Sequence, residues 1–425
     1  MKNKILQIYY DMRHQPVVTW ITFVGTALSI FLIMVVVMMQ QVSIMPYAPE
    51  SCRPRLLVGA YMHITNSNGG DASAGLSYGS AKKLYHGLDG IEHTSFISLG
   101  TSVGSVKGTS DNAFEVGVRK GDAEFFNIFD HTLVEGHYYS TEEANAQRPV
   151  AVITESVARR LFGSEQKTGN TFMLNHEPYT VVGVVKDNSK LALTGSGDIF
   201  LPTGPNDNTV NYTDINGVNA FGEVAVALLV KEGVDFDYIR RQVKARYAEF
   251  DTELADFEQK TVYHEAPYDQ ETIASGLSGS NVTPNPENER RERLIIYSLL
   301  LLVPAINLST MLHSRLRRRM SEIGIRRAFG CTRSRIMSDI IAENFIITVA
   351  GGAIGLLLSV IFAISYNGLF DSVDNFNVST PTLSVLLNWR ITLSALGACF
   401  LLNIISAALP AWQASRLNPV NAIKA

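Results

Sequence analysis

The chain has 425 residues and a formal net charge of −4, and 46% of its residues are hydrophobic. An acidic balance of this size argues against a nucleic-acid partner, because phosphate binding requires a concentrated basic face. The three cysteines show no metal or redox spacing, and the topology derived below separates them, which excludes a disulfide framework.

Four apolar runs are long enough to cross a bilayer as helices. A spanning helix needs about 20 apolar residues, since the hydrocarbon core is about 30 Å thick and each residue rises about 1.5 Å. None of the four runs contains Asp, Glu, Lys or Arg, and the first is too long for the apolar core of a signal peptide, which favours an uncleaved anchor. The runs are Val17–Met39, Leu294–Leu312, Phe345–Tyr366 and Ile391–Trp412.

Positive charge beside these runs predicts their orientation, because Lys and Arg concentrate on the cytoplasmic side. The loop after the second run carries eight arginines, namely Arg315, Arg317, Arg318, Arg319, Arg326, Arg327, Arg333 and Arg335. Both tails are basic, through Lys2, Lys4 and Arg13 and through Arg416 and Lys424, whereas the loop after the third run has Asp371 and Asp374 against Arg390. We therefore expect both termini in the cytoplasm and residues 43–290 outside it.

The predicted fold class is a membrane α-helical protein with four transmembrane helices and a large mixed α/β extracytoplasmic domain inserted between helices 1 and 2. The predicted segments are 1–42 (cytoplasmic N-terminal tail and helix 1), 43–290 (α/β domain), 291–315 (helix 2), 316–343 (cytoplasmic segment), 344–366 (helix 3), 367–390 (short outer loop), 391–412 (helix 4) and 413–425 (cytoplasmic C-terminal tail).

Within residues 43–290, β-rich segments indicate strands, several with alternating polarity. These segments are Arg55–His63, Ile91–Leu99, Phe114–Val118, Pro149–Ile153, Tyr179–Val185 and Glu223–Lys231. In the last of them, Val224, Val226, Leu228 and Val230 should line one face. The Gly/Ser/Asn/Pro-rich stretches Asn66–Gly75 and Ser275–Asn288 indicate loops or linkers.

Two helices are predicted in the same domain. Thr154 should cap a helix over Glu155–Phe162 that ends at Gly163. Asp235 should cap a second, whose apolar stripe has spacings of three and four residues. The stripe consists of Phe236, Ile239, Val243, Tyr247 and Phe250.

No catalytic or metal-binding motif is found in the sequence. The histidines lack HExxH or paired-ligand spacing, so solvated or packed histidines are favoured. There is no GxSxG motif, and no spacing selects an acid–base pair of carboxylates. Asp235 and Asp237 are typical of a helix start rather than of a calcium loop. We therefore predict that the chain has no catalytic residue, binds no metal and is not an enzyme.

The segment after the second run has the pattern of a short amphipathic helix. Ile325, Ala328 and Phe329 recur at i, i+3 and i+4, and Glu322 with Arg326 forms a favourable i, i+4 pair. Gly330 suits the left-handed position that ends a helix, and Thr332 can cap the next one. The pattern predicts an apolar ridge, rimmed by arginine, that is presented to another protein.

Small residues recur every four positions on the third run, at Gly351, Gly355 and Ser359. Such faces allow helices to approach closely. Packing within the subunit is the favoured interpretation, and a subunit interface is the alternative.

Several of these segments together resemble a known family. Glu322–Gly330 reads EIGIRRAFG and is similar to the segment between the second and third spans of the MacB/FtsX/LolC group of ABC transporter permeases, with Phe329 where Leu is usual and Cys331 where Ala is usual. The end of the chain, Leu409–Ile423, is similar to the tail of this FtsX-like domain. Four segments resemble the MacB-type extracytoplasmic domain, namely Phe125–Phe129, Leu133–Gly136, Val150–Gly163 and Tyr179–Asp187.

The resemblance implies a permease subunit that pairs with a second permease subunit, as a homodimer or a related heterodimer, and docks on a cytoplasmic ABC ATPase. ATP hydrolysis would change the outer domain by mechanotransmission, for export or extraction of a peptide, lipoprotein, toxin or drug. The ATPase-coupling residues carried over are Met320, Glu322, Ile323, Gly324, Ile325, Arg326, Arg327, Ala328, Phe329 and Gly330. Because no GxxxxGK[ST] phosphate loop occurs, we expect ATP and Mg on the partner and no cofactor on this chain.

The resemblance further implies a multi-pass protein of the bacterial inner (plasma) membrane, with residues 43–290 periplasmic and a periplasmic adaptor or outer-membrane component as a further candidate partner. Two alternatives stay open at this point. One is a membrane-anchored sensor or adhesin without an ATPase, and the other is an FtsX-like regulator of cell-wall hydrolases.

Overall fold

A computed structural model describes residues 16–107, 113–163, 167–188, 192–205, 207, 219–318, 320–365 and 389–415. The chain divides into two compact units. The first, here called the helical unit, comprises residues 1–42, 287–370 and 382–425; the second, here called the α/β domain, comprises residues 43–286 with 371–381. The predicted tails around Lys2, Lys4, Arg13, Arg416 and Lys424, the predicted loop at Asp371 and Asp374, and Arg319 lie outside the described residues.

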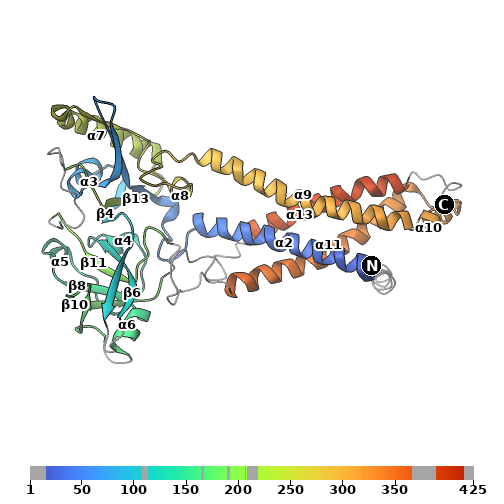
Figure 1. The fold of residues 1–425 in the computed structure, drawn as a ribbon, viewed down its shortest axis with the longest axis horizontal. Coiled ribbons are helices and arrows are strands. Elements are labelled where there is room, and N and C mark those ends of the chain that lie inside the picture. The colour runs from blue at the N-terminus through green and yellow to red at the C-terminus, as the bar shows by residue number, and fades with distance from the viewer. Residues whose placement is uncertain are drawn as a thin grey trace. The chain divides into compact units, whose positions relative to one another are not determined.

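The helical unit contains long helices at the positions of the four predicted runs (Figure 1). They are α2 (Pro16–Ile44), α9 (Pro286–Arg318), α11 (Arg333–Ser365) and α13 (Trp389–Ser415), and a short helix, α10 (Met320–Ala328), lies between α9 and α11 in sequence. No helix in the described part of the chain is both long enough and apolar enough to cross a membrane. The four membrane spans stay a prediction.

The helices extend beyond the predicted boundaries. Helix α9 begins at Pro286, inside the stretch expected to be a loop, and α11 begins at Arg333, twelve residues before the apolar run. With 33 residues each, both helices are about 50 Å long. Sequence hydropathy locates only the apolar part of such a helix, because the additional turns at its start are polar and charged.

The α/β domain is built on one extended sheet, to which fourteen strands contribute among the described residues. The strands are β1 (Leu56–Gly59), β2 (Tyr61–Asn66), β3 (Asp71–Leu76), β4 (Ile91–Ser98), β5 (Ser102–Lys107), β6 (Ala113–Gly121), β7 (Leu133–Gly136), β8 (Val150–Thr154), β9 (Thr171–Leu174), β10 (Glu177–Val185), β11 (Ile199–Pro202), β12 (Phe221–Gly222), β13 (Val224–Val230) and β14 (Gln259–Val262). The helices are α3 (Tyr78–Tyr85), α4 (Phe125–Ile128), α5 (Thr141–Asn145), α6 (Glu155–Phe162), α7 (Phe236–Leu254) and α8 (Gln270–Ala274), with single 3₁₀ turns at Arg53–Arg55 and Ala255–Phe257.

One part of the sheet closes on itself. The strand order β11-β8-β10-β9-β5-β6 returns to its start because β11 pairs with β6 as well as with β8. Alternate side chains of these strands form a buried core together with helix α6, including Val106, Val118, Ile153, Val181 and Leu161. This closed ring of six strands leaves no unpaired edge within it, which protects it from pairing with other chains.

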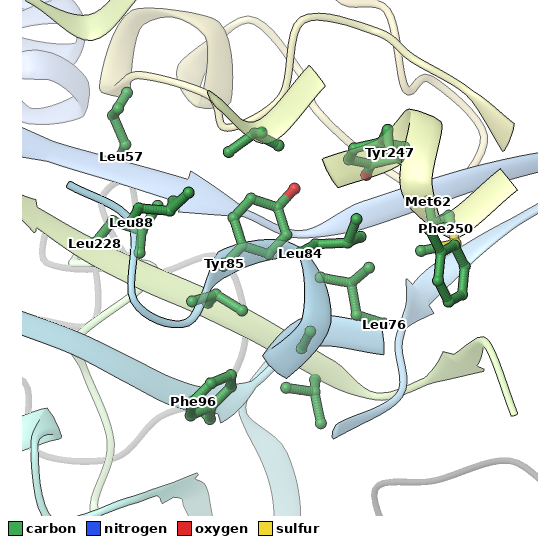
Figure 2. Close-up of a cluster of buried hydrophobic side chains, with 14 of the residues drawn as sticks. Leu57, Met62, Leu76, Leu84, Tyr85, Leu88, Phe96, Leu228, Tyr247 and Phe250 are labelled. Carbon is green, nitrogen blue, oxygen red and sulfur yellow. The ribbon is translucent and has the colours of Figure 1, made fainter. Parts of the chain in front are cut away.

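The other part of the sheet is open, in the order β4-β13-β3-β2-β14, and helices α3 and α7 pack on one of its faces (Figure 1). Tyr85 of α3 is fully buried there, and Figure 2 shows its ring among Leu84, Leu88 and the strand side chains. A Cβ atom on Gly59 would approach the Tyr85 ring to 2.5 Å. Glycine is therefore required at that position of β1 for the tyrosine to fit.

The structure confirms the apolar stripe of α7 and shows where β13 differs from the prediction. Val224, Val226, Leu228 and Val230 face the core under α3 and α7, as expected. However, the intervening Ala225, Ala227 and Leu229 are buried in a second core on the opposite face. A central strand covered on both sides reads as a continuous apolar run, and one-face alternation describes only half of its environment.

Two local predictions were wrong. The stretch Asn66–Gly75 is a hairpin rather than a loop, because β3 starts at Asp71 and pairs in register with β2. Thr154 occupies the N-cap position of α6, but its hydroxyl makes no cap bond and is buried without a partner. The start of α6 is instead bound by Asp187, which accepts hydrogen bonds from the Ser156 backbone N–H at 3.0 Å and hydroxyl at 2.6 Å.

Candidate functional site

The predicted coupling residues lie together in α10 and the turn that ends it. Gly330 has φ = +88°, a backbone region that L side chains rarely adopt. Its N–H donates to the Arg327 carbonyl at 3.1 Å, and the Cys331 N–H donates to the Arg326 carbonyl at 3.0 Å. These two bonds form a Schellman motif. The helix is thereby ended sharply at the predicted glycine.

A second helix starts immediately after this turn. The Thr332 hydroxyl accepts a hydrogen bond from the Arg335 N–H at 3.4 Å, at the start of α11. The cap was predicted, although the bond is long. Together the glycine turn and the cap fix the direction in which α10 leaves α11.

One face of α10 is packed against the rest of the helical unit. Ile323 and Gly324 are buried. Ile323 belongs to an apolar cluster with Leu316 of α9, Ile336 and Ile340 of α11, and Ala411 of α13. The short helix therefore contacts three longer helices through a small core. This anchoring makes α10 a rigid element rather than a loose loop.

The opposite face of α10 is exposed and apolar. Ile325 is 48% exposed and Phe329, one turn later, is 88% exposed. Beside these two apolar side chains, Arg326 donates a hydrogen bond of 2.6 Å to Glu322. An exposed phenylalanine on a rigid helix, next to charged groups that can orient a partner, is typical of a protein-binding surface. We call the exposed side chains of Glu322, Ile325, Arg326 and Phe329 the α10 ridge.

The remaining predicted coupling residues lie at the margins of this surface. Ala328 is exposed, whereas Met320 and Arg327 are half-buried. Side-chain chemistry on the ridge is limited to one carboxylate, guanidinium groups and apolar surface. Such a set of groups can bind a protein through apolar contact and charge complementarity.

The glycine face of α11 lies elsewhere and is directed toward α2. A Cβ atom on Gly355 would come within 2.5 Å of the Ala27 carbonyl oxygen, and one on Gly351 would lie 3.3 Å from Thr26. Ser359 is fully buried and donates to the Leu356 carbonyl at 2.7 Å. This geometry supports the favoured interpretation, packing within the subunit.

The α/β domain brings two histidines together that the sequence did not pair. His63 Nδ1 and His264 Nε2 are 2.8 Å apart, and His63 Nε2 lies 3.4 Å from Asp71. Burial and the neighbouring His63 lower the pKa of His264 below its usual value. Among the described residues, no group of three or more His, Cys, Asp or Glu side chains is arranged to hold a metal ion.

Sequence reasoning also missed a set of buried polar groups near the end of α2. Glu50 and Arg53 form a buried ion pair of 2.6 Å. Arg119 is 1% exposed, and burial lowers its pKa to about 10, an effect that Glu50 opposes. Burial also lowers the pKa of His131 to about 4. A charged residue in a short polar segment carries no sequence signal of burial, so only the folded chain reveals these contacts.

Comparison with known families gives two matches. Residues 19–246 match the model of the MacB-like periplasmic core domain, and residues 294–419 match the model of the FtsX-like permease C-terminal region. The first match alone covers more than half of the chain.

Individual relatives are more distant. The chain is 25% identical over 305 residues to the macrolide export ATP-binding/permease protein MacB of Escherichia coli, a match that covers 70% of this chain and 41% of MacB. It is 21% identical over 341 residues to an uncharacterized ABC transporter permease, YknZ, of Bacillus subtilis, covering 80% of this chain and 77% of YknZ. The chain thus spans less than half the length of MacB.

Among solved structures, the periplasmic region of MacB from Actinobacillus actinomycetemcomitans is similar at 18% identity and a TM-score of 0.34, over 50% of this chain and 90% of that region. The extracellular domain of YknZ from Gram-positive bacteria is similar at 13% identity and a TM-score of 0.32, over 48% of this chain and all of that domain.

Proposed function

The chain belongs to the MacB/FtsX-type family of ABC transporter permeases. We propose that it is the transmembrane subunit through which a separate ATPase changes the conformation of the α/β domain. The observation that carries this proposal is the α10 ridge. Phe329, the residue directly after α10, is 88% exposed, and α10 itself packs against α9, α11 and α13 through Ile323. A partner that buries this ring would gain apolar contact area on a surface that already has a fixed position.

The proposed partner at the ridge is a cytoplasmic ABC ATPase. Its docking surface should contain an apolar pocket for Phe329 and charged groups complementary to Glu322 and Arg326. A rigid helix is suited to transmit movement, because displacement of α10 moves the helices that pack on it. In this proposal the chain hydrolyses no ATP, since its sequence lacks a phosphate loop, and ATP and Mg bind to the partner.

The proposed topology places α2, α9, α11 and α13 across the bacterial inner membrane. It rests on the apolar runs within these helices and on the arginines that flank α10. The α/β domain would then lie in the periplasm and α10 in the cytoplasm. A second permease subunit, identical or related, completes the proposed complex.

The proposed work of the complex is mechanotransmission to the periplasmic side, for export or extraction of a peptide, lipoprotein, toxin or drug. MacB of Escherichia coli is named for macrolide export, which supports efflux of a small molecule as one case among these. A periplasmic adaptor or an outer-membrane component would complete an efflux path.

The test is the composition of the native complex. The tagged protein is extracted in mild detergent and whatever co-purifies is identified by mass spectrometry. We expect a stoichiometric ABC ATPase with the natural sequence and its loss from the double variant Ile325→Asp, Phe329→Asp. Both side chains are exposed, so this variant should keep its fold.

Val103→Asp is the matched control, since Val103 is 65% exposed in the α/β domain and lies outside the proposed ridge. It should retain the ATPase. Recovery of the natural protein without any ATPase, under conditions that preserve other membrane complexes, would favour the sensor or adhesin instead.

A further inference from the structure

The chain that leaves α2 is held by buried polar contacts rather than by a flexible linker. Glu50, six residues after α2 ends, is fully buried. One carboxylate oxygen accepts hydrogen bonds from the backbone N–H groups of Thr194 at 2.8 Å and Gly195 at 2.7 Å. The other accepts from Arg53 at 2.6 Å. The carboxylate therefore joins the exit of α2 to a loop some 140 residues away in sequence.

The same region binds the end of α2 itself. Arg53 donates to the Met45 carbonyl at 2.8 Å and lies over the ring of Tyr47 at 4.4 Å. Gln270 of α8 donates to the Ser43 carbonyl at 2.9 Å. The last carbonyls of a helix have no partner within it. Ser43, in the last turn of α2, and Met45, just beyond it, both belong to the α/β domain, and side chains of that domain bind their carbonyls.

The loop that Glu50 binds, residues 192–197, is fastened on its other side. Arg119 of β6 donates to the carbonyls of Leu193 at 2.7 Å and Ser196 at 3.1 Å. His131 contacts the Gly195 carbonyl at 3.0 Å through Nε2. A continuous set of hydrogen bonds thus runs from Met45, the residue after α2, through Arg53, Glu50 and the loop, to Arg119 of β6 in the closed ring of strands.

These contacts are a demanding way to hold residues 43–53 against the loop. Burying a carboxylate and two guanidinium groups carries a desolvation cost, and a buried ion pair is weak evidence of a gain in stability. A simple tether would need none of them. What the arrangement does provide is a fixed geometry between the end of α2 and the loop.

We propose that Glu50 is a positioning residue that transmits displacement of α2 to loop 192–197 and, through Arg119, to the closed ring of the α/β domain. This inference rests on the proposed function, because it supposes that nucleotide binding to the ATPase moves α2. It adds the route by which that movement enters the domain.

The test compares hydrogen–deuterium exchange of the complete co-purified complex, without nucleotide and with ATP plus vanadate. In the natural protein, exchange at the Thr194 and Gly195 amides should differ between the two conditions. In Glu50→Gln and in Arg53→Lys, that difference should become smaller by about fivefold or more, while ATPase binding and basal hydrolysis remain. Arg53→Lys is the milder change, because it keeps a positive charge beside Glu50 and removes the guanidinium that also binds the Met45 carbonyl.

Glu135→Gln is the matched control. Glu135 also accepts two backbone N–H bonds, from Lys167 and Thr168, and among the described residues the hydrogen bonds of its carboxylate go only to these two. It should leave the nucleotide-dependent difference unchanged. Exchange of the β8 and β10 amides reports whether each variant is folded, and if these amides exchange faster in Glu50→Gln, the result for Arg53→Lys decides.

The outcomes separate the two proposals. Absence of an ATPase from the natural complex defeats the proposed function, and the route with it. If the ATPase is present, the route alone is overturned by either of two results: no nucleotide-dependent difference at residues 192–197 in the natural protein, or an undiminished difference in a well-folded variant.

Discussion

Arg326 binds the carboxylate of Glu322 at 2.6 Å from one turn further along α10, beside the exposed ring of Phe329. An exposed pair at i, i+4 contributes only about 0.3–0.5 kcal/mol to helix stability. The helix is held by its buried face instead. The two charges therefore matter chiefly for what they present to a partner.

Reversing both charges, with Glu322→Arg and Arg326→Glu together, should uncouple the ATPase without unfolding the α/β domain. The two residues can still attract each other, but the charge pattern offered to the partner is inverted. Cargo-dependent ATP hydrolysis of the complex measures the effect. The paired reversal Lys83→Glu, Glu253→Lys is the control, because it inverts another exposed ion pair in the α/β domain. Unchanged cargo-dependent hydrolysis in the α10 variant would contradict the assignment.

Phe329→Ala should weaken ATPase binding strongly and leave the stability of the subunit unchanged. A central aromatic side chain of an interface contributes about 2 kcal/mol or more, which corresponds to about a thirtyfold loss of affinity. Titration of the purified ATPase against the detergent-solubilised variant gives the dissociation constant. Phe329→Leu should recover most of the affinity, since it restores apolar volume. Equal binding by the alanine and natural forms would show that the ring lies outside the interface.

Gly330→Ala should destabilise the end of α10 by about 1–2 kcal/mol, because an L side chain is strained at positive φ. No described atom lies within 4 Å of the position that the new Cβ would take, so the effect comes from the backbone alone. Gly330→Asn should be much milder, since asparagine tolerates this conformation better. Hydrogen–deuterium exchange of the backbone amides from Arg326 to Cys331 should be faster in Gly330→Ala than in Gly330→Asn. Equal exchange rates in the two variants would argue against backbone strain.

Gly355→Ala should loosen the contact between α2 and α11. The added methyl group would press on the Ala27 carbonyl at 2.5 Å, and overpacking of this kind costs about 1–3 kcal/mol. Gly397→Ala in α13 is the control, since no described atom lies within 4 Å of its Cβ position. Thermal unfolding in detergent should show a lower midpoint for the first variant only. Similar unfolding midpoints for the two variants would indicate that α2 and α11 accommodate the added methyl group without a loss of stability.

Two buried groups in the α/β domain should give opposite pH dependence. Burial raises the pKa of Asp122 to about 6, so the folded domain holds a proton that the unfolded chain loses, and this contribution to stability falls as pH rises from about 4 to 6. Burial lowers the pKa of His131 to about 4, so the unfolded chain binds the extra proton, and stability rises with pH from about 4 to 6.5. Each effect is on the order of 3 kcal/mol.

In the natural protein the two slopes should largely cancel between about pH 4 and 6. Asp122→Asn should therefore reveal a stability that increases with pH, and His131→Gln one that decreases. Urea titration followed by pulse proteolysis measures the α/β domain at each pH. Parallel curves for the two variants would mean that these groups do not titrate as their burial implies.

The sequence was most informative where one physical signal acted alone. Helix α6 spans the predicted Glu155–Phe162, and the Asp235 side chain caps α7 by accepting from the Asp237 N–H at 3.2 Å. Gly330 ends α10 because its conformation excludes most other residues. Such local features depend on neighbours within a turn, so they can be read directly from the chain.

Other parts depended on contacts between distant segments and could not be predicted. Strand β3 reads as a loop, since Asp71, Ser73 and Gly75 have low strand propensity, and pairing with β2, β12 and β13 holds the strand extended. The burial of Glu50 depends on amides 144 and 145 positions later. The exposure of Phe329 was predicted from helical spacing, but which face of α10 would be covered became clear only from the packing of Ile323.

The pairing of β11 with both β6 and β8 has a mechanical consequence. In an open sheet a pull at one side can peel strands away one hydrogen bond at a time. In a closed ring the same pull is shared by rows of bonds that must all yield together. A force applied to β6 would therefore displace the six strands together, and little of that displacement would be lost as deformation of the sheet.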